Sequence, residues 1–404
     1  MPVVRARTRR KQPSLWRRYR NVFVACVAVV GVVALYVWLL GPASKPKPPV
    51  AAAAPATTSQ AGGTSVVAAG PTVAPASAGA SPRDRTAAFP PIRLPADDAP
   101  HATGMEWWYY NGHLQGAGGA RFAYHVAIFL YDGMVRHTVF HVALTDLRTG
   151  KRYTRQIRTA GLPSDKNLPG YSFDYQGWRV SGSGGKHVVA IQEKDFALDL
   201  VLKDASPPVL HQAAGTATPG VLDFGPGGVS YYYSRPRMQA SGTVDVGGTR
   251  LPVQGDAWFD HQWGDFDGGG LAWNWFALQL DDGADVMLYQ LFSSKGVPIL
   301  TMGTVTRNQV TTPLSAADVG MRPVGAWVSP RTGIRFPAEW ELSLPMGVVR
   351  VKPVQADSEF DARETTFNVY WEGAVRVSGA VQGKGFVEMS GYDHVLSLQP
   401  AAAR

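Results

Sequence analysis

From Phe89 onward the chain shows short runs in which apolar residues recur at every second position. Such runs occupy residues 122–130, 140–144, 197–202, 276–280, 286–292 and 339–344. A period of two is typical of a β-strand with one buried face. Turn-forming pairs at Asp132-Gly133 and Asp282-Gly283, together with many other Gly and Pro residues, separate the runs. No stretch of this part holds a convincing helical period, so the pattern predicts an all-β fold.

A weak internal repeat indicates two similar halves. Trp107-Trp108-Tyr109 near the start of the first half parallels Trp273-Asn274-Trp275-Phe276 near the start of the second. Later, Tyr231-Tyr232-Tyr233 leads through Ser241-Gly242 to Asp260-His261, as Tyr370-Trp371 leads through Ser378-Gly379 to Asp393-His394. We therefore expect two β-barrel or sandwich domains in tandem, spanning residues 89–267 and 268–404.

The N-terminal part follows a different pattern. Residues 1–20 hold basic side chains and no acid, and an unbroken apolar run follows from Val22 to Leu40. At ~1.5 Å per residue this run covers roughly 28 Å, close to the hydrocarbon thickness of a bilayer. We expect residues 21–40 to cross the inner (cytoplasmic) membrane once, with a basic cytoplasmic arm at 1–20 and the folded domains in the periplasm. A cleaved signal peptide is the alternative interpretation.

Residues 41–88 consist mainly of Ala, Pro, Gly, Ser, Thr and Val and contain no aromatic residue. Such a composition cannot bury enough apolar surface to fold, which predicts a disordered linker. The formal net charge is +8, and the arm alone carries all of it, so the charges of residues 21–404 sum to zero. The folded part therefore gives no indication of a nucleic-acid-binding surface. The only cysteine, Cys26, lies in the predicted anchor, which excludes a disulfide or thiolate site in the exported part.

Candidate chemistry concentrates in the segment Trp258–Phe266, where two carboxylates, an imidazole and an amide stand among four aromatic residues. Burying a carboxylate among aromatic rings is costly unless it is paired, hydrogen-bonded or protonated. If the segment is extended, Asp260 shares a face with Trp258 and Gln262, whereas His261 faces the opposite way. These groups form either a satisfied structural network or a reactive site.

A second aromatic and polar cluster spans Met105–Leu114. In an extended chain one face carries Glu106, Trp108 and Tyr110, and the other carries Trp107, Tyr109, Asn111 and His113. Both faces are mixed, unlike those of a plain core strand. A sheet packed on both sides, with its polar groups paired, is the structural alternative to a functional role.

Together these segments resemble the carotenoid 1,2-hydratase family and its AttH-like relatives, which are known as predicted secreted hydrolases. The segments that carry the resemblance are Glu106–His113, His141–Asp146, Asp260–Gly264, Tyr370–Gly373 and Gly391-Tyr392, within about residues 90–396. The resemblance implies two lipocalin-like β domains and a hydrophobic ligand, such as a lipid or an acyclic isoprenoid.

Other site classes receive little support. The chain has no Gly-x-Ser-x-Gly motif for a serine hydrolase. His137 and His141 share a strand face, but at ~3.3 Å per residue they stand roughly 13 Å apart, too far for one metal ion. His113, His125 and His261 can converge only through tertiary folding. We expect no cofactor and no metal site.

The leading hypothesis is addition of water to an alkene by acid catalysis. Asp260 is the expected proton donor, because an apolar site raises the pKa of a carboxyl and keeps it protonated. Trp258, Trp263 and Trp108 are candidates for stabilising a cation with their π faces. His261 or Tyr110 would position the water, and Glu106 completes the candidate catalytic set. The candidate ligand-binding residues are Trp108, His113, Trp258, Gln262, Trp263 and Trp275.

Two alternatives use the same aromatic residues without catalysis. In the first, the protein is a lipid carrier or chaperone that acts with a membrane transporter, and Asp260 is only hydrogen-bonded. In the second, exposed aromatic residues bind another protein. The predicted anchor favours the carrier, whereas the polar cluster favours the enzyme.

Overall fold

The computed structural model describes residue 86 and residues 89–164, 167–266 and 270–401. The predicted arm (1–20) and anchor (21–40) lie outside the described residues. Of the predicted linker, only Thr86 is described; it is buried, and its Oγ1 accepts a hydrogen bond from the Ala217 N–H at 2.9 Å. Within the described part of the chain, no helix is both long and apolar enough to cross a membrane.

The described residues form two large antiparallel sheets, so the all-β prediction is confirmed. The strands of the first sheet are β1 (Met105–Gly116), β2 (Arg121–Tyr131), β3 (His137–Asp146), β4 (Arg152–Ala160), β5 (Tyr171–Tyr175), β6 (Trp178–Ser183), β7 (Lys186–Gln192), β8 (Phe196–Asp204), β9 (Val209–Leu210), β10 (Val221–Asp223), β11 (Gly228–Val246) and β12 (Thr249–Phe266). Those of the second are β13 (Ala272–Leu280), β14 (Asp285–Phe292), β15 (Pro298–Arg307), β16 (Val310–Leu314), β17 (Gly320–Val328), β18 (Arg335–Leu344), β19 (Gly347–Pro353), β20 (Glu359–Asp361), β21 (Val369–Gly379) and β22 (Gly383–Ser390). The helical elements among the described residues are short 3₁₀ turns: η1 (Ala96–Asp98), η2 (Ala117–Gly119), η3 (Gly225–Gly227) and η4 (Leu396–Leu398).

The alternating runs of the sequence become strands of these sheets. The runs at 122–130 and 140–144 lie in β2 and β3, and those at 276–280 and 286–292 lie in β13 and β14. The predicted Asp-Gly turns separate the two strands of each pair. Period-two alternation therefore located strands correctly, because each sheet buries at least one face.

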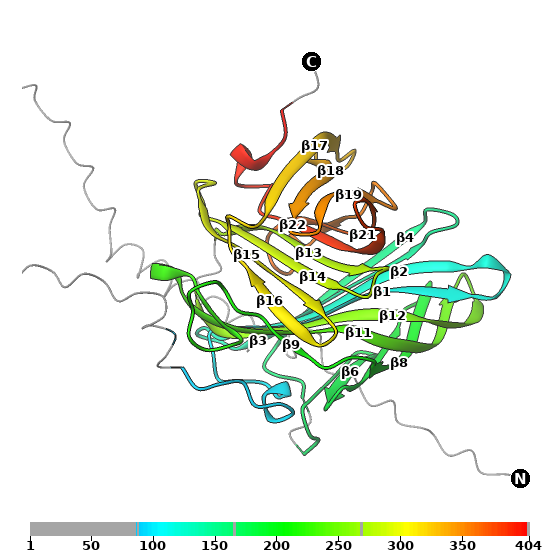
Figure 1. The fold of residues 1–404 in the computed structure, drawn as a ribbon. Helices are drawn as coiled ribbons and strands as arrows, with labels where there is room; N and C mark the ends of the chain where they lie inside the picture. The colour runs from blue at the N-terminus through cyan, green and yellow to red at the C-terminus, as the bar shows by residue number, and fades with distance from the viewer. Residues whose placement is uncertain (1–85, 87–88, 165–166, 267–269, 402–404) are drawn as a thin grey trace, which may run out of the picture. The chain divides into compact units, whose positions relative to one another are not determined.

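The two sheets share one topology, which accounts for the weak internal repeat. The first has the order β4-β3-β2-β1-β12-β11-β8-β7-β6-β5, and the second the order β16-β15-β14-β13-β22-β21-β19-β18-β17. In both sheets the first strand pairs with the last strand, and the last strand also pairs with the long strand that precedes it in the sequence (Figure 1). The curl of each sheet around its own apolar interior agrees with the lipocalin-like architecture expected.

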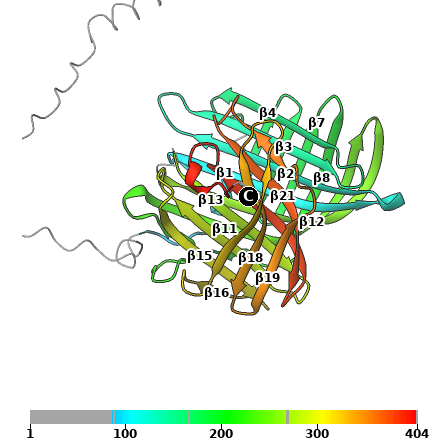
Figure 2. The same ribbon diagram turned by 90° about the horizontal axis from the view of Figure 1, so that it is seen from above.

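Buried apolar side chains fall into three main groups. One fills the interior of the first sheet and includes Trp108 and Phe259, and another fills that of the second and includes Phe276. The third lies between the sheets and includes Trp258 and Trp275. Contacts join β22 to β1 and β13 to β11, and Figure 1 and Figure 2 show β13 near β1 and β11. The central strands of each sheet are thus buried on both faces.

The pairing of β1 with β12 decides where the candidate residues point. Tyr109 lies opposite Asp260, and Trp107 lies opposite Gln262. One residue further along each strand, Trp108 lies opposite His261 on the other face. Gly264 permits a close approach of β11 here, because a Cβ at this position would lie 2.3 Å from the Val229 carbonyl oxygen.

Candidate functional site

The main cavity of the described residues lies between the two sheets and has a volume of about 690 Å³. This volume falls within the range of small-molecule sites. Its walls are largely aromatic, with Trp107, Tyr109 and Tyr232 from the first sheet and Trp273, Trp275 and Tyr289 from the second. Three acids, Asp260, Glu388 and Asp393, also line it. Such a cavity suits an apolar ligand that meets a few polar groups.

Asp260 is held rigidly in the cavity wall. Trp258 Nε1 donates to its Oδ1 at 2.7 Å, and the Ser234 hydroxyl and the Tyr232 hydroxyl also donate to the carboxyl. Ser234 in turn accepts from His211 Nε2 at 2.6 Å. Burial outweighs these hydrogen bonds and raises the pKa of Asp260 to about 7. The carboxyl therefore carries a proton over part of the neutral range, as an acid catalyst requires.

Three other predicted residues lie between the sheets with Asp260: Trp258 and Gln262 on the first sheet, and Trp275 on the second. Gln262 and Trp275 line the cavity. Trp258 lies beneath them, with its ring centroid 6.4 Å from that of Trp275. His113 shares the Asp260 face of the first sheet but is absent from the cavity wall; it packs on Phe386 and donates to the Gly385 carbonyl at 3.3 Å.

The remaining predicted residues lie on the opposite face, inside the first sheet. Trp108, Tyr110 and Trp263 belong to its apolar interior, and none of them lines the cavity. The Tyr110 hydroxyl bonds to the Tyr171 hydroxyl and to His187 Nδ1, the latter at 2.9 Å. The structure thus separates these three residues from Asp260, because successive residues of a strand point to opposite faces.

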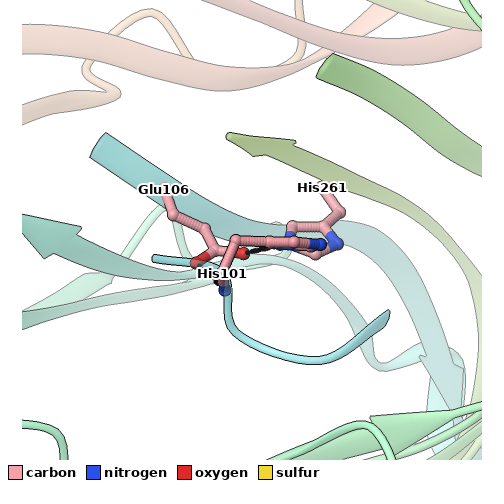
Figure 3. A group of neighbouring side chains, drawn as sticks. All are labelled: His101, Glu106 and His261. Carbon is pink, nitrogen blue, oxygen red and sulfur yellow. Dashed lines mark hydrogen bonds and ion pairs between the residues drawn. The ribbon is translucent and has the colours of Figure 1, made fainter. Parts of the chain in front are cut away.

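Glu106 and His261 form a triad with His101 on this inner face (Figure 3). Glu106 Oε1 accepts from His101 Nδ1 at 2.7 Å and from His261 Nε2 at 2.8 Å. Its Oε2 accepts from the His101 main-chain N–H at 2.8 Å. Burial raises the pKa of Glu106, but the hydrogen bonds from His101 and His261 outweigh it and lower the pKa below the usual value. The triad thus supplies the ionised carboxylate with three hydrogen bonds.

Two histidines and a carboxylate also form a ligand set that zinc accepts, and the ligand atoms lie within 4.8 Å of one another. However, His261 Nδ1 is buried and has no hydrogen-bond partner among the described residues. A metal on Nε2 would make that Nδ1 a buried donor without an acceptor, which metal-bound histidines avoid. Hydrogen bonding alone accounts for the arrangement.

Sequence reasoning did not single out Glu388, another acid of the cavity. The repeat aligned Asp260-His261 with Asp393-His394, yet Asp393 lies in the loop after β22. The strand register gives a different correspondence. Asp260 lies opposite Tyr109, and Glu388 lies opposite Trp275, the counterpart of Tyr109 in the repeat. Aligning the halves by their first strands, and counting along the pairing, is the signal that would have found Glu388.

Comparison with known proteins agrees with this architecture. A family model described as AttH-like matches residues 85–392. No curated protein matches the chain. The crystal structure of a protein from Nitrosomonas europaea classed as an AttH is 28% identical, with a TM-score of 0.67, and the match covers 75% of this chain and 98% of that one. Kievitone hydratase from Nectria haematococca shares the fold at 18% identity with a TM-score of 0.61, covering 76% of this chain and 94% of its own. Since the family model spans well over half of its length, the chain belongs to the AttH-like family.

Proposed function

We propose that the protein binds an apolar, unsaturated ligand between its two sheets and adds water to a double bond by acid catalysis. The observation that carries this proposal is a buried carboxyl, Asp260, in the wall of an aromatic cavity. Kievitone hydratase has a similar fold, and its name supports a hydration reaction in this architecture. An acyclic isoprenoid is the ligand class that we favour.

In the proposed reaction the Asp260 carboxyl breaks its O–H bond and gives the proton to one alkene carbon. The neighbouring carbon becomes a cation, and the faces of Trp273 and Trp275 lie in the same cavity to stabilise it. Water then forms a C–O bond to the cation and loses one proton. One water is consumed, and no other co-reactant is needed. The surrounding aromatic walls limit the entry of further water, which protects the cation.

A non-catalytic lipid carrier is the second candidate. Its supporting observation is that Trp258, Ser234 and Tyr232 all donate to Asp260, as they would to a purely structural carboxyl. In this case the cavity only holds the ligand, and a membrane transporter would deliver or remove it. The two functions predict the same ligand class but differ in whether the ligand leaves the protein chemically changed.

We also propose that residues 21–40 anchor the chain in the cytoplasmic membrane, with the folded part on the outer side. The apolar run and the preceding basic residues support this topology. A reporter fused after Arg404 should be active only in the exported compartment. Activity in the cytoplasm would contradict the topology and the transporter partnership together.

The function is tested first by native mass spectrometry of the full-length protein released from detergent, which detects a co-purifying ligand. The protein is then incubated with geraniol, farnesol and geranylgeraniol in H₂¹⁸O. Hydration adds one labelled water to the mass of the alcohol. A labelled product supports the enzyme, and a bound but unchanged ligand supports the carrier. An empty protein that binds none of the three alcohols contradicts both.

A further inference from the structure

We propose that Glu388 is the second catalytic group of the cavity, placed across from Asp260 by the duplication of the sheet, and that the two carboxyls divide the proton transfers of hydration. This inference rests on the proposed function. It adds a residue that neither the repeat in the sequence nor the aromatic motif pointed to.

Glu388 occupies in the second sheet the place that Asp260 occupies in the first. Both lie on the last strand of their sheet, β12 or β22, and that strand pairs with the first strand, β1 or β13. On the other side, Asp260 lies opposite Ser234 of β11, and Glu388 lies opposite Glu372 of β21. Two residues further along β12 and β22, Gln262 is opposite Tyr232, and Ser390 is opposite Tyr370. The duplication therefore places one acid at the same site of each sheet.

Matching contacts cross between the sheets around the two acids. Trp275, the strand neighbour of Glu388, donates from Nε1 to the Tyr232 hydroxyl at 2.9 Å. Tyr109, the strand neighbour of Asp260, bonds in the corresponding way to Tyr370. Each acid thus lies beside an aromatic residue that is fastened to the opposite sheet. Each sheet turns the equivalent face toward the other sheet, so both carboxyls line one cavity.

The surroundings of Glu388 suit proton exchange. Burial raises its pKa to about 8, a hydrogen bond from Trp273 acts against this, and the nearby Asp260 carboxyl raises the pKa further. Because the two carboxyls line one cavity and interact, the proton of a singly protonated pair belongs to the pair rather than to one residue. Other titratable groups that face Glu388 are Glu372 and Tyr370 on β21, Tyr289 on β14, and Tyr109 and Tyr131 of the first sheet.

With one proton on the pair, the chemistry balances without an outside acid or base. The Asp260 carboxyl gives its proton to the alkene carbon and becomes a carboxylate. The attacking water forms the C–O bond, and its O–H bond breaks as the Glu388 carboxylate takes the proton. The pair ends with one proton, as it began, and water in the emptied cavity returns it to Asp260. Two carboxyls with these complementary roles are a common solution in hydrolytic enzymes.

Asp393, the partner of Asp260 in the sequence repeat, is the competing candidate. Its Oδ2 accepts from the Val369 N–H at 2.8 Å, and its Oδ1 bonds to His394 Nδ1 at 2.7 Å. These bonds hold the loop after β22 against the start of β21. Asp393 also lines the cavity, but both of its carboxyl oxygens are engaged in these local bonds.

The pairing is tested without a substrate by infrared spectroscopy of full-length protein in a detergent that has no carbonyl group. The protonated carboxyl band is followed against pH. Asp260→Asn should move the midpoint of the Glu388 band to lower pH, because the like charge that opposed its ionisation is gone. Asp285→Asn removes a buried carboxyl outside the cavity and should leave the Glu388 midpoint unchanged. An unchanged midpoint in Asp260→Asn would overturn the pairing.

The catalytic role is tested with the alcohol that the wild type hydrates. Glu388→Gln should lower kcat by roughly 10²–10⁴-fold while the affinity for farnesol, followed by tryptophan fluorescence, changes by less than about three-fold. The double variant with Asp260→Asn should be far less impaired than the product of the single losses, because the two groups act as a unit. Asp285→Asn, which removes a buried carboxyl outside the cavity, should retain turnover within about ten-fold.

An active Glu388→Gln variant would refute this inference and leave the proposed hydration intact. A wild type that hydrates none of the alcohols would refute the proposed function and the catalytic role of Glu388. In that case the infrared titration still decides whether the two carboxyls form a pair.

Discussion

Glu106 and Asp260 are buried carboxyls on neighbouring strands of one sheet, yet their pKa values are shifted in opposite directions. Glu106 points into the sheet interior, where two imidazoles and a main-chain N–H bind it and lower its pKa. Asp260 points to the cavity between the sheets, where neutral donors leave its pKa raised to about 7. The comparison shows that burial alone does not fix the charge of a carboxyl. Both carboxyls accept three hydrogen bonds, so the difference lies in whether the donors can carry charge.

The largest expected effect is on turnover. Asp260→Asn keeps the shape of the side chain but removes the transferable proton, so hydration should fall by ~10²–10⁴-fold with ligand affinity nearly unchanged. Steady-state kinetics and tryptophan fluorescence measure the two quantities separately. Lost stability together with intact turnover per folded molecule would instead show that Asp260, like Glu106, is a structural carboxyl.

Glu106→Gln should act on stability. The variant removes the charge that both imidazoles of the triad bind, which should lower the free energy of unfolding by roughly 3 kcal/mol, the order of a broken buried ion pair. Denaturant unfolding measures this, with the exposed Glu364→Gln as a control expected to change it by less than about 0.5 kcal/mol. Farnesol affinity should remain that of the wild type, because Glu106 does not line the cavity. A loss of affinity would mean that the two faces of the sheet are coupled.

The two carboxyls should also give stability profiles of opposite sign against pH. The pKa of Asp260 rises from 3.8 in the unfolded chain to about 7, so its contribution is full below pH ~4 and is lost as the pH rises through 7. The pKa of Glu106 is lowered from 4.5, so its contribution is present above that value and is lost as the pH falls further.

Relative to wild type, Asp260→Asn should therefore gain on the order of 2–4 kcal/mol between pH 4 and pH 8. The loss of unfolding free energy caused by Glu106→Gln should become smaller only at acidic pH. Denaturant unfolding across this pH range measures both profiles. Parallel profiles for the two variants would abolish the distinction between the faces.

The smallest expected effect concerns the bond that joins the sheets at the cavity. Trp275→Phe keeps an aromatic wall but removes the Nε1 donor to Tyr232, which should lower the free energy of unfolding by about 1 kcal/mol. Trp263→Phe, inside the first sheet, is the matched control and should leave farnesol affinity unchanged. Calorimetry measures the change in stability, and fluorescence titration measures the affinity for farnesol. The comparison tests Trp263, which the sequence suggested as a ligand-binding residue and which the structure places in the interior of the sheet.

Much of the fold was predictable from local patterns. Alternation located β2, β3, β13 and β14, and the paired aromatic segments indicated two similar halves. The period of two also predicted that Asp260 and His261 face opposite ways, which the register confirms. These features depend on residues close in the chain, and the geometry of an extended strand carries them directly.

The composition of the candidate site was less predictable. Within one motif, Asp260 and Gln262 reach the cavity, whereas His261 and Trp263 do not. The sequence alone showed that these faces differ, but it contained no sign of which face would meet the second sheet. His101, which completes the triad of Glu106 and His261, comes from the segment before β1 and had no motif of its own.

By itself the sequence determined the strand content, the duplication, and a carboxyl that must be either satisfied or reactive. The tertiary structure alone decided that Asp260 shares its cavity with Glu388 rather than with Glu106. The physical reason is that strand register and the packing of two sheets bring together residues more than a hundred positions apart. Local patterns record which side of a strand a residue occupies, whereas the contacts across the cavity are set only when the second sheet folds against the first.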